Sequence, residues 1–320
     1  MLFTSISSEA FDQKNISKDI HEMNDHIKNL LSNAPPSHEI PFDVLQEIRR
    51  QGGGLLAFQP HSKHAENREV GYGDHKVLVR IFNRDSPDFI YMHIHGGGHC
   101  IGAADMQDQS LEKMSNDLNC VVVSVEYRLA PTNPYPAAPD DCETAAIWLI
   151  ENSKNEFNTE KIIIGGESAG ANLSAVILLR LKSKGLLNTI KGANLIYGSY
   201  DARLTPSAIR QEGSEDIFLL SYAMIRKFRD SYFQGDIDKS LPDVSPIQGD
   251  LKGMPPALFT IGTRDLLLDD SLFMYGRWLS YGSNAEILIV PGADHAFNAF
   301  PSDTTTLVED KINKFLRSIL

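Results

Sequence analysis

One serine lies in a spacing that suits a nucleophile. Ser168 has a glycine two residues before it and another two residues after it, Gly166 and Gly170. The β-branched run Ile162 to Ile164 predicts a buried parallel strand before this pattern, and Ala171 to Lys184 predicts an amphipathic helix after it. A sharp turn between them would project the serine hydroxyl above the sheet, and the glycines leave room for neighbouring backbone. The free N–H groups of the helix would favour an anionic intermediate at the same place.

A serine hydroxyl becomes a good nucleophile only when a base removes its proton and a carboxylate holds that base. On a strand–turn–helix framework, the acid and then the histidine follow the serine in the chain. Nine of the ten histidines lie at or before His99, and only His295 follows Ser168. His295 stands in a turn-rich loop directly after the predicted strand Glu286 to Val290. We therefore predict that His295 is the general base.

The acid that orients this base is predicted to be Asp265, just past the end of the predicted strand Ala257 to Ile261. Asp269 and Asp270 have the positions of helix-start residues, where carboxylates accept free N–H groups. Asp294 is adjacent to the histidine and would have to fold back to reach its ring. Asp269 is also expected to steady the loop that carries Asp265.

The negative oxygen formed by serine attack needs preorganised donors, each worth about 2.7–4 kcal/mol in comparable sites. The predicted strand Phe89 to His95 runs directly into a glycine triplet, residues 96–98. Glycine allows close approach and positive φ, so the N–H groups of Gly97, Gly98 and Ala169 are the predicted donors. A second triplet, residues 52–54, follows no predicted strand and indicates a flexible turn.

Three histidines close to this triplet permit a different chemistry. His93 and His95 would share one face of a strand and, with His99, could ligate zinc for a metal-assisted hydrolysis. The glycines between them hold no fixed geometry, and no second histidine cluster supplies further ligands. The serine mechanism also gives His295 a role that a zinc site would leave unexplained. We therefore favour the serine mechanism.

The remaining chain predicts the framework for these residues. Further strands are expected at residues 76–82, 120–126 and 193–197, and helices at residues 104–118, 139–151, 269–281 and near the C-terminus. Strands that alternate with helices indicate an α/β fold with a mostly parallel sheet covered on both faces. In such sheets the reactive groups collect beyond the carboxyl ends of the strands.

Two regions do not fit this alternation. Helices predicted at Glu9 to Leu31 and Asp43 to Arg50 precede every predicted strand, so we expect them outside the sheet. Residues 201–249 are too long for a plain connection and contain a predicted helix, Leu219 to Phe233. Its aromatic stripe, which includes Phe228, favours packing against the core, although it would also suit a segment that covers a site.

Composition limits the class of partner. The chain of 320 residues carries 30 basic and 42 acidic residues, a net charge of −12 that disfavours nucleic acid or an anionic membrane as main partner. Three cysteines without C-x-x-C spacing indicate neither a disulfide framework nor a thiolate metal site. We find no signal-peptide pattern and no apolar run long enough to span a bilayer, and we expect a soluble cytoplasmic protein.

Together these motifs resemble the hormone-sensitive-lipase-like branch of the α/β-hydrolase esterases. The resemblance runs from about Lys76 to the C-terminus, and its anchors are the motifs His95-Gly-Gly-Gly, Glu126-Tyr-Arg-Leu-Ala-Pro, Pro136-Ala-Ala with Asp141-Cys142, Gly166-Glu-Ser-Ala-Gly, Val244-Ser-Pro, Pro255-Pro-Ala, Gly262-x-x-Asp265-x-Leu-x-Asp269 and His295-x-Phe297. It implies an α/β-hydrolase fold with an eight-stranded sheet. It also implies a helical cap from residues 1–50 and an insertion at about 201–240, on a catalytic domain of residues 51–320.

The same resemblance implies hydrolysis of carboxylic esters of short to medium acyl length through an acyl-enzyme, with no cofactor and no metal. It supports Ser168, Asp265 and His295 as the triad, with His95 orienting the oxyanion loop. A homodimer is possible, since dimers are common in this branch. A catalytically silent binding protein on the same fold, or an amidase or acyltransferase with the same triad, are the alternatives.

Two residues depart from the family pattern. Glu167 stands before the nucleophile where the family usually has aspartate, and His99 follows the glycine triplet where an aromatic or aliphatic residue is common. Both adjoin the expected site. Glu167 is expected to support the catalytic residues without itself contacting the substrate. We expect these departures to affect substrate preference more than reaction type.

Overall fold

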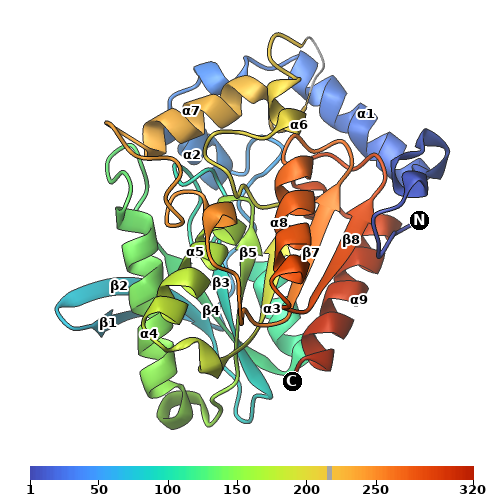
Figure 1. Cartoon of the computed structure of the whole chain (residues 1–320). Helices are drawn as coiled ribbons and strands as arrows, with labels where there is room; N and C mark the ends of the chain where they lie inside the picture. Colours follow the sequence, from blue (N-terminus) through green and yellow to red (C-terminus); the bar gives the residue numbers. More distant parts are fainter. Residues whose placement is uncertain (215–217) are drawn as a thin grey trace.

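A computed structural model describes residues 1–214 and 218–320 of the chain. Its centre is an eight-stranded sheet in the order β1-β2-β4-β3-β5-β6-β7-β8, shown in Figure 1. The strands are β1 Ala65–Tyr72, β2 His75–Phe82, β3 Phe89–Ile94, β4 Cys120–Glu126, β5 Ile162–Glu167, β6 Ile190–Ile196, β7 Ala257–Gly262 and β8 Ala285–Val290.

The first two strands form an antiparallel hairpin, and β2 pairs antiparallel with β4. From β4 to β8 all neighbours pair in parallel. The mostly parallel α/β sheet predicted from the sequence is therefore confirmed. The residue pattern alone did not predict β1, because this edge strand buries only Val70 and lacks the apolar run of an interior strand.

Helices cover both faces of the sheet. The α-helices are α1 Lys18–Ser32, α2 Phe42–Arg50, α3 Asp108–Leu118, α4 Ala137–Phe157, α5 Ala169–Ser183, α6 Pro206–Ile209, α7 Tyr222–Tyr232, α8 Leu268–Ser280 and α9 Asp303–Ser318. Figure 1 shows α4, α5 and α8 in front of the sheet and α3 and α9 behind it. The interior strands β3, β5 and β7 are buried almost throughout, as strands covered on both faces must be.

Several predicted helix ends differ from the structure. The predicted helix Glu9 to Leu31 becomes two 3-10 turns, Ser8–Phe11 and Gln13–Asn15, and α1 begins only at Lys18. The Asp12 carboxylate accepts the N–H of Lys14 at 3.0 Å, and such local side-chain bonds compete with helix formation. The helix α7 is shorter than predicted because the Ser221 hydroxyl caps it by accepting the Met224 N–H at 3.2 Å.

Two other helices also differ from their predicted bounds. The helix predicted from residue 104 begins at Asp108, because the Ala104 N–H instead meets the Glu126 carboxylate at 2.5 Å. The helix predicted at residues 139–151 extends at both ends to Ala137–Phe157. Ends shift in this way because tertiary contacts, which the local sequence does not reveal, satisfy or remove the terminal backbone groups.

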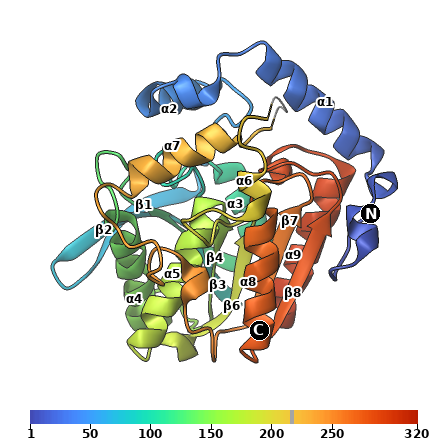
Figure 2. The same ribbon diagram turned by 45° about the horizontal axis from the view of Figure 1, so that its top comes forward.

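Three helices lie above the edge at which the parallel strands end. Figures 1 and 2 place α1 and α2, from the N-terminus, and α7, from the segment between β6 and β7, over this edge. The helices α2 and α7 face one another across a parallel ring pair, Phe42 and Phe228, with centroids 5.4 Å apart. Among the described helices, none combines the length and apolar character needed to cross a bilayer.

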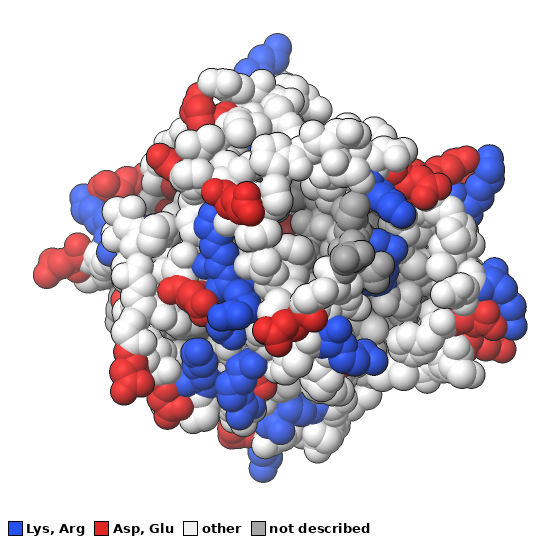
Figure 3. Space-filling view, turned by 90° about the horizontal axis from the view of Figure 1, so that it is seen from above, with Lys and Arg blue, Asp and Glu red and all other residues white. Residues whose placement is uncertain are grey.

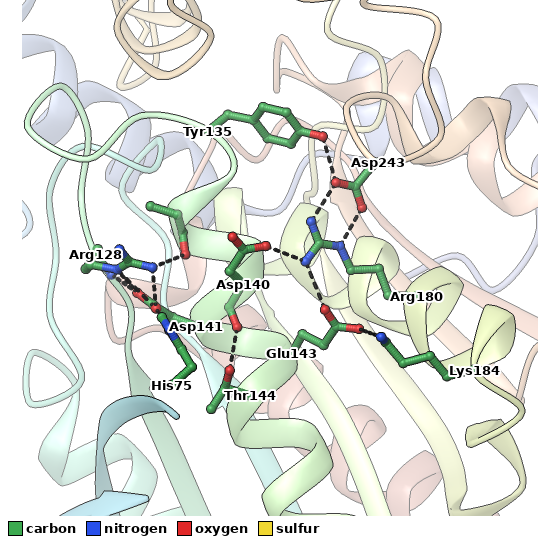
Figure 4. Close-up of polar contacts among 11 residues, drawn as sticks. His75, Arg128, Tyr135, Asp140, Asp141, Glu143, Thr144, Arg180, Lys184 and Asp243 are labelled. Carbon is green, nitrogen blue, oxygen red and sulfur yellow. Dashed lines mark hydrogen bonds and ion pairs between the residues drawn. The ribbon is translucent and has the colours of Figure 1, made fainter. Parts of the chain in front are cut away.

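The segment that returns from α7 toward β7 is anchored by a charged cluster, shown in Figure 4. Arg180 on α5 donates to both carboxylate oxygens of Asp243, at 2.6 and 2.7 Å, and to Asp140 on α4 at 2.8 Å. The Tyr135 hydroxyl donates to the same Asp243 at 2.7 Å. Since such forked arginine contacts fix direction as well as distance, the returning segment is held against α4 and α5.

Candidate active site

The turn from β5 into α5 holds Ser168 in a backbone conformation that few L-residues adopt, with φ of 56° and ψ of −118°. Its N–H donates to Ile196 O at 2.9 Å, which ties the turn to β6. A Cβ at Gly166 or at Gly170 would lie 2.0 or 1.8 Å from Ile94 O. Only glycine therefore fits at these two positions, which explains the spacing noticed in the sequence.

The structure brings the serine, histidine and aspartate predicted from sequence into one hydrogen-bonded row. The Ser168 hydroxyl lies 2.9 Å from His295 Nε2, and His295 Nδ1 lies 2.7 Å from Asp265 Oδ2. The other carboxylate oxygen of Asp265 accepts the Leu267 N–H at 2.8 Å. The histidine and aspartate are buried, and the three residues come from the carboxyl ends of β5, β7 and β8. This is the arrangement that activates a serine hydroxyl by proton transfer to imidazole.

The remaining aspartates turn away from the histidine ring. Asp294 accepts the backbone N–H of His295 at 2.8 Å, and Asp269 accepts the Ser207 N–H at 2.7 Å. The Ser207 hydroxyl in turn donates to Leu266 O at 2.9 Å, so Asp269 is linked to the Asp265 loop through Ser207.

Residues 95–102, here called the oxyanion loop, pass beside Ser168. A Cβ at Gly96 would lie 3.3 Å from Ser168 Cβ. Gly97 has φ of 116° and Gly98 has φ of 60°, and a Cβ at Gly97 would lie 1.9 Å from Ile101 O. Within residues 1–214 and 218–320, no hydrogen bond uses the N–H of Gly97 or of Gly98. Both N–H groups are thus available to a developing negative oxygen.

His95 stabilises the start of this loop from inside the protein. Its ring stacks on Tyr127 with centroids 4.1 Å apart, and its Nδ1 lies 2.8 Å from Gly96 O. Burial lowers the pKa of His95 to about 4, so the ring is neutral at neutral pH and donates from Nδ1 to that carbonyl. The Tyr127 hydroxyl donates to His95 O at 2.9 Å.

Glu167 joins the nucleophile turn to the oxyanion loop. One carboxylate oxygen accepts the Gly96 N–H at 2.7 Å and the side-chain amide of Gln107 at 2.5 Å, and the other lies 3.1 Å from His93 Nε2. Burial alone would raise the pKa of Glu167, but the charge and hydrogen bond of His93, with the Gly96 N–H, hold the pKa below its usual value. The carboxylate therefore stays ionised beside the site.

The three histidines that suggested zinc have separate partners. His93 Nδ1 lies 2.9 Å from the Ser124 hydroxyl, and His95 bonds within its own loop. His99 stacks on Tyr232 with centroids 3.9 Å apart, and its Nε2 lies 3.3 Å from Asn172 Oδ1. Burial lowers the pKa of His99 to about 4, which keeps this ring neutral as well.

Gln46, Gln107 and Phe228 contact the oxyanion loop or its partners without having been predicted as site residues. Glutamine is common on helices and loops. Nothing in the spacing of Gln46 or Gln107 along the chain distinguishes them from ordinary surface residues. The aromatic stripe of the predicted helix Leu219 to Phe233 did include Phe228, but the pattern favoured plain packing.

A family model described as alpha/beta hydrolase fold matches residues 91–299. An esterase from Acinetobacter venetianus is 34% identical over 183 residues, which are 57% of this chain and 58% of that protein. An ethyl acetate hydrolase from Pseudomonas putida is 28% identical over 231 residues, 70% of this chain and 72% of that protein. The match to the first relative thus spans less than two thirds of its length.

The similarity extends to the whole architecture. The crystal structure of a hormone-sensitive lipase from a metagenome library superposes with a TM-score of 0.79, over 95% of this chain and 99% of the other. The two sequences are 23% identical, so this match shows a shared fold.

Proposed function

The chain belongs to the α/β-hydrolase fold family, and we propose that it is a serine carboxylesterase for esters of short to medium acyl length. The family match and the two esterase relatives support the resemblance of its motifs to the hormone-sensitive-lipase-like branch. The observation that carries the proposed activity is the row Ser168, His295 and Asp265, with hydrogen bonds of 2.9 and 2.7 Å. The relative named ethyl acetate hydrolase supports a small ester as substrate.

In the proposed reaction, the Ser168 oxygen attacks the ester carbonyl while His295 Nε2 takes the hydroxyl proton. Asp265 holds the imidazole by its Nδ1–H and stabilises the imidazolium that forms. The carbonyl oxygen becomes negative and is bound by the N–H groups of Gly97, Gly98 and Ala169. The intermediate collapses, His295 returns the proton to the leaving alcohol, and the acyl group stays on the serine. Water, activated by the same histidine, then releases the carboxylic acid.

Residues 1–50 and about 201–240 are proposed to form a cap over the catalytic domain of residues 51–320. The position of α1, α2 and α7 above the sheet edge that carries Ser168 supports this division. Residues 215–217 of the insertion lie outside the described residues.

Figure 3 shows that the face seen from above carries charged residues of both signs. Seen from above, Lys and Arg are intermixed with Asp and Glu and separated by uncharged residues. A surface of mixed sign does not steer a polyanion, and the net charge of −12 opposes one. A cytoplasmic location and a homodimer stay predictions, although the buried thiols Cys100, Cys120 and Cys142 suit a reducing compartment.

The activity is tested with p-nitrophenyl esters from acetate to palmitate. We expect kcat/KM to be highest among the short and medium acyl chains and Ser168→Ala to lower it at least about a thousandfold. Ser183→Ala, at the exposed far end of the same helix, should leave it unchanged. If Ser168→Ala kept more than about a tenth of the wild-type rate, the serine mechanism would be wrong.

This experiment also tests the alternative that the chain is a catalytically inactive binding protein. Such a protein needs no base beside the serine, whereas His295 lies within hydrogen-bond distance of the Ser168 hydroxyl. Turnover of any ester in the series that disappears with Ser168→Ala excludes it. An amide series with the same acyl groups, run alongside, separates esterase from amidase preference.

A further inference from the structure

The oxyanion loop, residues 95–102, is held from outside the catalytic domain by the N-terminal helix α2. The Gln46 side-chain amide donates to Gly102 O at 2.8 Å, and its carbonyl oxygen accepts the Gly102 N–H at 2.8 Å. Both ends of one side-chain amide are therefore paired with the backbone of one residue. Paired contacts of this kind fix orientation as well as distance.

Gly102 passes this constraint to the beginning of the loop. It has φ of 103°, and a Cβ there would lie 2.5 Å from His95 Nδ1 and 2.7 Å from Gly96 O. The end of the loop thus packs directly on its start. From the other side, Glu167 accepts the Gly96 N–H at 2.7 Å. Gly96 is therefore held between α2, through Gly102, and the nucleophile turn, through Glu167.

A second contact from the same helix reaches the middle of the loop. The Phe42 ring on α2 lies parallel to the Phe228 ring on α7, with an angle of 5° between them. A Cβ at Gly98 would lie 2.2 Å from the Phe228 ring, so this ring covers the Gly98 backbone. Lys227 stabilises the packing of the two rings. Its ammonium donates to Ile40 O at 2.6 Å and lies 4.5 Å from the centroid of the Phe42 ring.

From these two contacts we propose that α2 positions the oxyanion loop, with Gln46 as a positioning residue for the N–H groups of Gly97 and Gly98. The proposal rests on the esterase function proposed above. Gln46 touches neither the serine nor the histidine in any hydrogen bond of the described residues, and it acts through Gly102. The negative oxygen exists only after attack, so loss of this constraint lowers kcat and leaves KM nearly unchanged.

The test compares Gln46→Leu with Gln51→Leu, which makes the same change at the exposed C-terminal end of α2, where the Gln51 side-chain amide donates to the Glu47 carboxylate at 2.7 Å. We expect Gln46→Leu to lower kcat about 5- to 50-fold with KM within about twofold, and Gln51→Leu to match the wild type. Gln46→Glu keeps an acceptor for the Gly102 N–H but loses the donor to Gly102 O. Its kcat should therefore lie between that of Gln46→Leu and that of the wild type.

Hydrogen exchange gives a readout that does not depend on turnover. The hydrogen-bonded loop amides of Gly96, Cys100, Ile101 and Gly102 should exchange at least about tenfold faster in Gln46→Leu than in the wild type, while those of β5 stay unchanged. Equal loop exchange, or an unchanged kcat, in Gln46→Leu would overturn the proposal. If the wild type hydrolysed no ester, the proposed function would fail, yet the exchange comparison would still decide whether Gln46 holds the loop. Uniformly faster exchange in Gln46→Leu would indicate global destabilisation and also count against the proposal.

Discussion

At the scale of single residues, the site depends on two neighbours that point in different directions from one strained turn. Ser168 takes a positive φ, which directs its hydroxyl to His295, and Glu167 before it reaches the Gly96 N–H at 2.7 Å. The same turn therefore presents the proposed nucleophile and fixes the loop that carries the proposed oxyanion donors. Strain of this kind persists only where surrounding contacts determine the backbone, as at Gly166 and Gly170.

The first prediction at this scale concerns Glu167. Glu167→Ala leaves the buried Gly96 N–H without its acceptor, and an unsatisfied buried donor costs about 1–3 kcal/mol of free energy. Because this N–H fixes the oxyanion loop, kcat should fall about 10- to 100-fold. Glu167→Gln keeps an amide oxygen for that N–H and should lose less. Steady-state kinetics on p-nitrophenyl butyrate measures both variants, with Glu151→Ala on the exposed part of α4 as the control. Equal kcat values for the alanine and glutamine variants would contradict the role of the hydrogen bond.

The sequence was sufficient to predict which three residues lie together in the hydrogen-bonded row, but not the residues that hold the loop. The serine has a pattern set by sterics, and His295 is the single histidine after it, so order along the chain decided both. Gln46 and Gly102 are 56 residues apart, and their contact joins a side chain to backbone. Backbone partners leave no signature in residue type, so only the folded chain reveals such a contact.

At the scale of elements, the loop after β8 connects the proposed base, His295, to the segment that leads into α7. Asp294 accepts the His295 N–H at 2.8 Å with one oxygen and the Leu219 N–H at 3.1 Å with the other. The Arg264 guanidinium, which lies 3.7 Å from the same carboxylate, is also 4.8 Å from the Phe218 ring centroid. One carboxylate thus couples the backbone of the base to the entry of the proposed cap.

Asp294→Asn tests this coupling. An amide offers one acceptor where the carboxylate offers two, so either His295 or Leu219 loses its partner, and we expect kcat at pH 8 to fall about 3- to 10-fold. Burial raises the pKa of Asp294 to about 6, so the wild-type group is protonated at pH 5 and resembles the amide. The ratio of wild-type to variant kcat should therefore shrink between pH 8 and pH 5. A ratio that stays constant over this range would count against the coupling through Asp294. An equal loss of kcat in the exposed control Asp230→Asn would also count against this coupling.

Elements were predicted more reliably in the interior than at their ends. The interior strands form apolar runs because both faces are covered, and their positions agree with the structure to within a few residues. The edge strand β1 shows no such run, and only the resemblance to the family, which implies eight strands, predicted an additional strand. Helix starts at Lys18 and Asp108 depend on hydrogen bonds of Asp12 and Ala104 that compete with the helix.

At the scale of the whole molecule, an acidic chain keeps in its interior a carboxyl group that has no cationic partner among residues 1–214 and 218–320. Asp270, fully buried at the start of α8, accepts the N–H groups of Tyr200 at 2.6 Å and Asp201 at 3.0 Å and the Thr205 hydroxyl at 2.7 Å. These contacts fasten the chain after β6 to α8, whose first turn follows the Asp265 loop. Burial nevertheless raises the pKa of Asp270 to about 7, against the lowering effect of those hydrogen bonds.

This pKa makes the free energy of unfolding depend on pH. The folded protein keeps the Asp270 proton up to about pH 7, whereas an unfolded aspartic acid releases it near its model value of 3.8. Between these values the folded state binds more protons, so the contribution of Asp270 to stability is fully present below pH 3.8 and is lost as pH rises toward 7. Asp270→Asn removes this dependence and keeps the contacts, since its amide oxygen can accept both N–H groups and its nitrogen can donate to the Thr205 hydroxyl.

Urea unfolding of the wild type and of Asp270→Asn at pH 5, 6, 7 and 8 measures the effect. We expect the wild type to lose stability relative to the variant as pH rises from 5 to 7, with a slope of up to about one proton, and the difference to level off by pH 8. Asp74→Asn, in the exposed turn between β1 and β2, should show no such trend. A difference between wild type and Asp270→Asn that is flat with pH, or that changes in favour of the wild type as pH rises, would show that Asp270 is ionised in the folded protein throughout this range. In that case the contacts of Tyr200, Asp201 and Thr205 would outweigh burial, and the segment after β6 would be held by a charged acceptor.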